Sequence, residues 1–307
     1  MKEGHASRTA EYMALFRALE SSRPAGQRLF EDRLARHFLS PPLAFVARVS
    51  AVPALRGLIP WFIDHRWPGA RSSAVARTRF IDDAVITCLE DRIEQVVILG
   101  AGFDSRAYRL QALENVPVFE VDHPDTLRTK RGTLVRALSS LPERVRFVPT
   151  DFNQRQLAQA MAVAGYRNSV PSLFLWEGVT NYLTEAAVDA TLRWCSRAAP
   201  GSRLVFTYVH SAVLDDPRSF IGTEKLLATL EASGENWTFG IDPSAVSDFL
   251  ARRGLMLERD LGAEDYRRLY FKEAARRMRG YEFYRIAVAR VPEHAVQQAN
   301  GADAPPA

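Results

Sequence analysis

The stretch VVILGAGFDSRAYRL, residues 96–110, determines how the rest of the chain is interpreted. An aliphatic run ends at Gly100, and the bend Gly100-Ala101-Gly102 follows it directly. Glycine is needed at such a bend because the backbone must turn tightly and let a ligand approach closely. A helix is predicted to begin near Ser105, and its free N–H groups would offer an edge that suits anions. The pattern predicts a buried strand, a ligand-contacting bend and a helix.

Further apolar runs follow, with helix-compatible sequence between them. Continuous apolar strands that alternate with helices predict a parallel sheet covered on both faces. We expect a doubly wound, mostly parallel, Rossmann-like α/β sheet of about seven strands, the last being a candidate antiparallel addition. The other six strands are predicted at VFEVD (118–122), VRFVP (145–149), SLFLW (172–176), LVFTYV (204–209), LMLERDL (255–261) and YEFYRIAVARV (281–291).

Composition and predicted secondary structure divide the chain into three parts. Residues 1–92 contain no convincing strand and predict an N-terminal helical cap over the acceptor, ending in a long helix from Ser73 to Asp91. Residues 93–291 form the predicted core. Residues 292–307 are polar, small and proline-containing, which predicts a disordered tail.

Composition narrows the class of protein. The 307 residues are 47% hydrophobic and carry a net charge of +4 without a long basic run, so nucleic acid is not an expected partner. Two cysteines, Cys88 and Cys195, are too few for a disulfide framework or a zinc site, and no metal-ligand spacing is present. We see no signal peptide and no apolar run of about 20 residues, so we expect no membrane span and a cytoplasmic location. The sequence is silent on oligomeric state.

A carboxylate stands where a nucleoside site needs one. Asp122 closes the second predicted strand, 20 residues after Gly102. A carboxylate there can accept hydrogen bonds from both hydroxyls of a ribose, as in dinucleotide sites. The bend and Asp122 together predict a crevice for an adenosine-type cofactor at the carboxyl ends of the strands.

The same residues disfavour an anionic dinucleotide. Ser105 occupies the place of the third glycine of the pyrophosphate fingerprint, and Asp104 puts a negative charge where a pyrophosphate would lie. A cationic cofactor without phosphate fits better, and S-adenosylmethionine is such a cofactor. Two alternatives stay open on this fold, a nicotinamide-dependent oxidoreductase and a nucleoside-cofactor-binding protein without catalysis.

Several motifs follow one another along the chain, namely GAGFDSRAYRL (100–110), FEVDHPDTLRTKRGTL (119–134), VPTDF (148–152) and LFLWEGVTNYLTEAAVDATL (173–192). With these motifs the chain resembles the leucine carboxyl methyltransferase family, and more closely its bacterial S-adenosylmethionine-dependent O-methyltransferase branch. The likeness extends from about Ser7 to Val291. The resemblance implies a class I methyltransferase fold.

The resemblance implies contacts of the glycine bend with the methionine portion and of three further residues with the nucleoside part of the cofactor. Gly100 and Gly102 would pass beneath the methionine portion, and Asp122 would hold the ribose hydroxyls. Asp151 and Phe152 would meet the adenine, with Asp151 accepting from its exocyclic amine. Asp151 could instead cap a helix that starts at residue 153.

For the methionine part, the resemblance implies that Arg79 pairs with the carboxylate, and Arg77 is the alternative. Glu177, at the tip of the fourth strand, would lie near the amino group or the sulfonium. An unpartnered carboxylate at an apolar strand end would be costly, which favours a binding role for Glu177. Asp104 would contact the ligand or cap the helix that follows it.

The reaction implied is an in-line transfer of methyl to an oxygen of a small molecule. A carboxylate acceptor is ionised at neutral pH and needs no base, whereas a phenol or another hydroxyl benefits from one. We slightly prefer a carboxylate. His210, which follows the fifth strand, is the candidate base, although a lone histidine is more often structural. Tyr182 is a candidate wall of the acceptor pocket.

Overall fold

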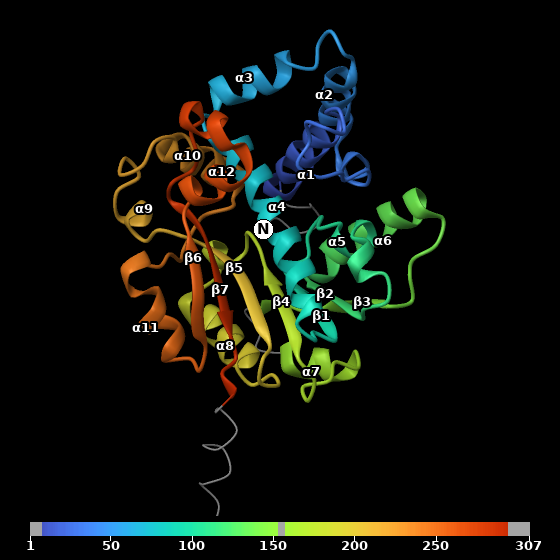
Figure 1. The fold of residues 1–307 in the computed structure, drawn as a ribbon, viewed down its shortest axis with the longest axis vertical. Coiled ribbons are helices and arrows are strands. Elements are labelled where there is room, and N and C mark those ends of the chain that lie inside the picture. The colour runs from blue at the N-terminus through green and yellow to red at the C-terminus, as the bar shows by residue number, and fades with distance from the viewer. Residues whose placement is uncertain (1–7, 153–156, 294–307) are drawn as a thin grey trace, which may run out of the picture.

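The computed structural model describes residues 8–152 and 157–293, and these contain one seven-stranded sheet (Figure 1). The strand order is β3-β2-β1-β4-β5-β7-β6. β1 to β5 are parallel, and β7 is antiparallel to both of its neighbours. The predicted doubly wound, mostly parallel sheet and its antiparallel last strand are therefore confirmed. The strands are β1 (Gln95–Leu99), β2 (Val118–Asp122), β3 (Val145–Pro149), β4 (Ser172–Trp176), β5 (Arg203–Val209), β6 (Met256–Leu261) and β7 (Tyr284–Arg290).

Both faces of the sheet are buried because strand side chains alternate between two apolar clusters. Val97 and Leu99 of β1 join one cluster, and Val96 and Ile98 join the other. The first face packs against α7 (Leu157–Val163), α8 (Glu185–Cys195) and α11 (Val246–Ala251), and the second against α4 (Ala70–Glu90) and α12 (Ala263–Phe271). Short helix α5 (Arg106–Arg109) follows β1, and α6 (Pro124–Leu138) packs beside β2 and β3.

A helical layer lies over one end of the sheet, above it in Figure 1. It contains α1 (Arg8–Ser21), α2 (Pro41–Ala51), α3 (Leu58–Arg66), α9 (Ala212–Asp215) and α10 (Thr223–Ser233). The described residues before β1 contain no strand, as expected. However, α4 serves both layers, because Ala74 and Val75 join the apolar cluster of the helical layer whereas Ile81 and Val85 pack on the sheet. The predicted tail lies outside the described residues except for Pro292 and Glu293.

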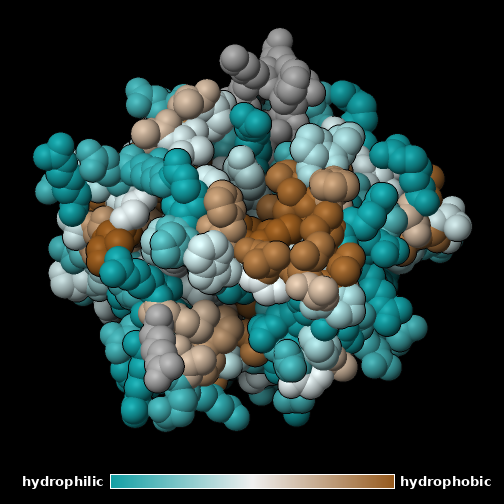
Figure 2. Space-filling view, turned by 90° about the horizontal axis from the view of Figure 1, so that it is seen from above, coloured by the Kyte–Doolittle hydropathy of each residue, from teal (hydrophilic) through white to brown (hydrophobic). Residues whose placement is uncertain are grey.

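Apolar side chains also gather on the outer surface of α2 and α3. Phe45, Leu58, Trp61 and Phe62 are each more than half exposed, and Figure 2 shows brown side chains clustered on this upper face. Within the described residues, no helix combines the length and hydropathy that crossing a bilayer requires. Cys88 and Cys195 are buried as free thiols in α4 and α8.

Candidate active site

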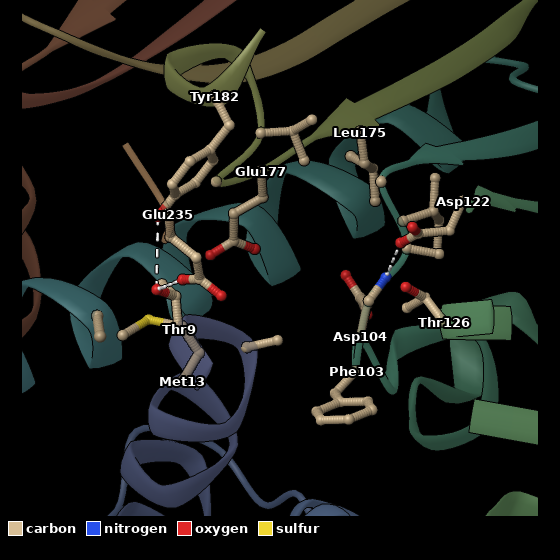
Figure 3. A pocket seen from close by; sticks show the side chains of 18 of the residues that line it. Thr9, Met13, Phe103, Asp104, Asp122, Thr126, Leu175, Glu177, Tyr182 and Glu235 are labelled. Atoms are coloured by element: carbon tan, nitrogen blue, oxygen red, sulfur yellow. Dashed lines mark hydrogen bonds between the residues drawn. The ribbon is translucent and has the colours of Figure 1, made fainter. Parts of the chain in front are cut away.

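A cavity of about 560 Å³ lies between the carboxyl ends of the strands and the helical layer (Figure 3). Its walls come from the segments after β1, β2, β3 and β4 and from α1, α4 and α10. Ligands of doubly wound sheets bind at this edge. Most residues predicted for the site line it, namely Gly100, Gly102, Asp104, Asp122, Asp151, Phe152, Glu177 and Tyr182.

The glycine bend has the geometry that the sequence predicts. Gly100 and Gly102 have φ angles of +69° and +40°, which side chains rarely adopt. A Cβ atom on Gly100 would lie 2.2 Å from Cγ2 of Val179 in the segment after β4. Glycine at position 100 therefore allows two neighbouring strand ends to approach each other beneath the cavity.

Replacing Gly100 by alanine is expected to destabilise the fold more than the same change at Gly201. Both glycines have positive φ angles, +69° and +82°, but no atom lies within 4 Å of a Cβ added to Gly201. Gly201→Ala should cost about 1–2 kcal/mol for the left-handed backbone alone. Gly100→Ala should cost about 1–3 kcal/mol more, because Val179 must move. Urea unfolding of both variants measures the difference. Equal losses in the free energy of unfolding would contradict a steric clash between a side chain at position 100 and Val179.

Asp122 is fixed at the end of β2 by two backbone donors. Its Oδ2 accepts from the N–H of Gly102 at 2.6 Å, and its Oδ1 accepts from the N–H of His123 at 2.6 Å. Burial raises the pKa of Asp122, although the two N–H groups act in the opposite direction. Because each carboxylate oxygen has two lone pairs, Asp122 can still accept hydrogen bonds from a diol in the cavity.

Arg77 and Glu177, which both line the cavity, form a largely buried ion pair. Arg77 Nε lies 2.8 Å from Glu177 Oε1, and its guanidinium lies 4.6 Å from the centre of the Tyr284 ring. Arg106 Nη1 lies 2.9 Å from the second oxygen of Glu177. Burial alone would raise the pKa of Glu177, but the charges of Arg106 and Arg77 outweigh it and lower the pKa. Glu177 is therefore held as a carboxylate.

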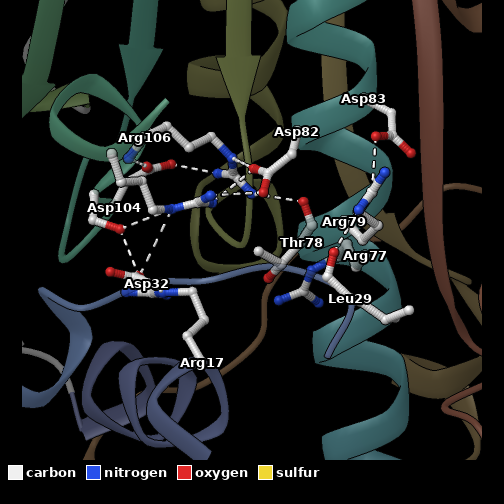
Figure 4. A network of polar contacts seen from close by, with 12 residues as sticks. Arg17, Leu29, Asp32, Arg77, Thr78, Arg79, Asp82, Asp83, Asp104 and Arg106 are labelled. Carbon is white, nitrogen blue, oxygen red and sulfur yellow. Dashed lines mark hydrogen bonds and ion pairs between the residues drawn. The ribbon is translucent and has the colours of Figure 1, made fainter. Parts of the chain in front are cut away.

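Of the two arginines that the sequence left open, only Arg77 lines the cavity. Arg79 contacts Asp83 and the carbonyl of Leu29 (Figure 4). The side chain of Arg79 is 40% exposed and that of Arg77 is 7% exposed. Residues two positions apart on a helix project in nearly opposite directions, so α4 cannot bring both to the cavity. The expected contact of Arg79 with a ligand is not supported by this placement.

Asp104 both lines the cavity and accepts a hydrogen bond from the first N–H of α5, one residue before the N-cap Ser105. Its Oδ1 accepts from the N–H of Arg106 at 2.7 Å, and its Oδ2 pairs with the Arg106 guanidinium. Burial would raise the pKa of Asp104, but the charges of Arg106 and then Lys130 lower it to about 2. The expectation of a helix start with free N–H groups needs correction here, because α5 has four residues and its first N–H is taken by Asp104.

The two candidate catalytic residues are placed differently. Tyr182 lines the cavity and donates to Thr9 Oγ1 at 3.5 Å. Burial raises the pKa of Tyr182 to about 12. His210 is not among the lining residues: its ring packs 5.3 Å from that of Phe220, and its Nδ1 accepts from the N–H of Ala212. The structure does not bring His210 to the cavity.

Part of the wall was missed by sequence reasoning. It comes from α1 and from the segment after α10, which are far apart in the chain and carry no local motif. Only tertiary packing brings them together, through the hydrogen bond from the Arg8 N–H to Glu235 Oε1 at 3.0 Å. The missed residues include Thr9, Met13, Glu235 and Trp237 from these two segments, together with Tyr284 at the start of β7.

Comparison with known proteins gives related sequences and folds. The family model described as leucine carboxyl methyltransferase matches residues 10–196, more than half of the chain. A Parafrankia protein named "Putative S-adenosyl-L-methionine-dependent methyltransferase" is 36% identical over 64% of this chain and 61% of its own. A Bacillus subtilis protein of the same description is 30% identical over 62% of each chain. The chain thus spans about three-fifths of the length of these relatives.

Two solved structures share the fold at low sequence identity. A DUF574 family protein from Streptomyces avermitilis has a TM-score of 0.59 at 15% identity, covering 94% of this chain and 99% of its own. A Thermobifida fusca protein titled as a "putative methyltransferase" has a TM-score of 0.56 at 16% identity, covering 93% and 98%. These two likenesses extend over the helical layer as well as the sheet.

Proposed function

The chain belongs to the leucine carboxyl methyltransferase family, and we propose that it is an S-adenosylmethionine-dependent methyltransferase acting on an oxygen of a small molecule. The observation that carries this proposal is the arrangement of charges along one cavity wall. Asp122 lies at the glycine bend, and the Arg77–Glu177 pair lies on the neighbouring strand end and helix. This order suits the diol, the carboxylate and the ammonium of the cofactor.

The residues fit the cofactor by chemical type. Asp122 would hold the ribose diol, and Asp151 and Phe152 would meet the adenine. Arg77 would hold the methionine carboxylate, and Glu177 its ammonium group. These roles rest on the lining of the cavity and on the family's motifs.

The glycine bend and the residues after it offer few hydrogen-bond donors to the pyrophosphate of a dinucleotide. The Ser105 hydroxyl donates to Asp32 at 2.6 Å, and the Asp104 carboxylate lines the cavity where a pyrophosphate would need donors. Both features weigh against the oxidoreductase alternative.

S-adenosylmethionine would supply an already activated methyl group. The tasks left to the chain are to bind the two partners, to orient them and to exclude water. Orientation of this kind accounts for about 7–11 kcal/mol of a barrier in well-aligned reactions.

Calorimetry with S-adenosylmethionine, S-adenosylhomocysteine and NAD(H) tests the proposal. We expect the two sulfur compounds to bind and NAD(H) not to bind. Arg77→Met should weaken both by about 10- to 150-fold, the range for losing a hydrogen bond to a charged group. Arg79→Met, the matched control two residues away, should bind within about twofold of the unmodified chain, since that side chain faces Asp83. Binding of NAD(H) alone would refute the function, and equal losses in the two variants would refute the role of Arg77.

A further inference from the structure

The cavity has a second half that the proposed cofactor contacts do not use. In the view of Figure 3, Glu177 lies between Asp122 on one side and a group containing Thr9, Tyr182 and Glu235 on the other. The nucleoside and methionine contacts proposed above end at Glu177. The half with Glu235 is therefore left for the acceptor.

Glu235 is a buried carboxylate at this end of the cavity. It is 8% exposed and follows α10. Its Oε1 accepts from the N–H of Arg8 at 3.0 Å, and its Oε2 accepts from the Thr9 hydroxyl, which itself accepts from Tyr182. Among the described residues, no cation lies within ion-pairing distance of it. Two lone pairs on the carboxylate remain for a ligand.

Among the described residues of the cavity wall, no guanidinium group is left for the carboxylate of an acceptor. Arg77 is already assigned to the methionine carboxylate of the cofactor, and the other lining guanidinium groups are paired with carboxylates: Arg17 with Asp32, Arg106 with Asp82, Asp104 and Glu177, and Arg109 with Asp82. A carboxylate acceptor would therefore lose its hydration beside the negative charge of Glu235 without gaining a cation of the chain, and only the sulfonium of the cofactor would offset this cost. A hydroxyl acceptor would instead donate a hydrogen bond to Glu235.

Glu235 is also the group best placed to take a proton. Burial raises the pKa of Tyr182 to about 12, so its hydroxyl stays protonated at neutral pH and acts as a donor. His210 does not line the cavity. The hydrogen-bond chain from Tyr182 through Thr9 ends on Glu235 and fixes its orientation.

The rest of this half is apolar and partly aromatic, which suits a flat ring. The Trp237 and Tyr284 rings lie 6.4 Å apart in an edge-on arrangement. The apolar and aromatic lining residues here are Met13, Leu226, Leu230, Trp237, Tyr281 and Tyr284.

We propose that the acceptor is a phenol and that Glu235 is the general base that removes its proton. This inference rests on the proposed methyltransferase function. The phenol O–H bond breaks and its proton passes to Glu235, while the oxygen forms a bond to the methyl carbon. The bond between that carbon and the sulfonium sulfur breaks, and its electron pair stays on sulfur. The products are an aryl methyl ether and S-adenosylhomocysteine.

A matched pair of probes tests the charge argument without relying on turnover. The affinities of 2-naphthol and 2-naphthoate are measured by calorimetry on the chain saturated with S-adenosylhomocysteine. We expect 2-naphthol to bind at least tenfold more tightly. Glu235→Gln should bring the two affinities within about threefold, whereas Glu231→Gln, the same change at an exposed position of α10, should leave the preference intact. Tighter binding of naphthoate, an unchanged preference in Glu235→Gln, or no binding of either probe would overturn the proposal.

Turnover with a labelled methyl donor tests the base. Glu235→Gln should lower the methylation of 2-naphthol on the order of 10²- to 10⁴-fold. The loss should be under tenfold for 4-nitrophenol at pH 8, because that phenol is already largely ionised. Equal losses for both phenols, no turnover of either, or base-labile ester as the product would overturn the proposal. Weakened S-adenosylhomocysteine binding in Glu235→Gln would place the residue on the cofactor instead. Failure of the unmodified chain to bind either sulfur compound would refute the proposed function itself.

Discussion

Replacing Arg106 by methionine is expected to lower the free energy of unfolding by about 3–5 kcal/mol, the cost of breaking a buried ion pair from one side. The Arg106 side chain is 3% exposed and contacts Asp82, Asp104 and Glu177. In the variant, Asp82 still pairs with Arg109 and Glu177 still pairs with Arg77, so Asp104 is the carboxylate left without its ion-pair partner. Urea unfolding measures the change.

The control for this prediction is an exposed pair. Arg268 pairs with Glu264 one turn away on α12, and both side chains are well exposed. Arg268→Met should therefore cost no more than about 1 kcal/mol. Losses of similar size in the two variants would contradict the view that burial makes the Arg106 network important.

Replacing Arg106 should also change how the free energy of unfolding depends on pH in the acid range. The pKa of Asp104 is about 2 in the folded chain, below its usual 3.8, so its ionised form stabilises the fold above about pH 4. This contribution is lost as the pH falls from about 4 to 2. In Arg106→Met, Asp104 loses the guanidinium that lowers its pKa. The decrease in the free energy of unfolding that Asp104 causes between about pH 4 and 2 should then become smaller or turn into an increase.

Replacing Asp122 by alanine is expected to weaken S-adenosylmethionine binding by about 1.5–3 kcal/mol, the range for hydrogen bonds to a charged group. The carboxylate is held by the N–H groups of Gly102 and His123, so its removal also leaves two backbone donors unpaired. A moderate loss of thermal stability should accompany the loss of affinity.

Asp91→Ala serves as the control for the binding measurement. Asp91 follows α4, does not line the cavity, and pairs with Arg203 at the surface. Affinities are compared at a temperature where all variants are folded. If Asp122→Ala is folded and binds as tightly as Asp91→Ala, the residue does not hold the ribose.

The sheet was predictable because its signals are local. Each strand is a short apolar run, and the bend at Gly100 requires a residue without a side chain. The position of Asp122 after the second strand is equally local, since parallel neighbours end at the same edge. Such features depend on a few consecutive residues, so the sequence alone reveals them.

The remaining site residues depend on contacts between distant segments. The choice of Arg77 over Arg79 depends on the rotation of α4, which packing sets through residues such as Val85. His210 stands at a strand end as expected, but its N–H donates to Phe283 and it pairs with Ile241, which turns its ring toward Phe220. Glu235 meets α1 only in the folded chain. No run of neighbouring residues encodes these outcomes.

The placement of β7 between β5 and β6 has a consequence for biosynthesis. β5 leaves the ribosome long before β7, and until then the main-chain groups along one side of β5 have no partner. An unpaired edge of this kind is prone to join strands of other nascent chains. A chain whose translation stalls between residues 261 and 284 should therefore be an aggregation-prone intermediate. It should need chaperone protection until β7 is synthesised and pairs with β5.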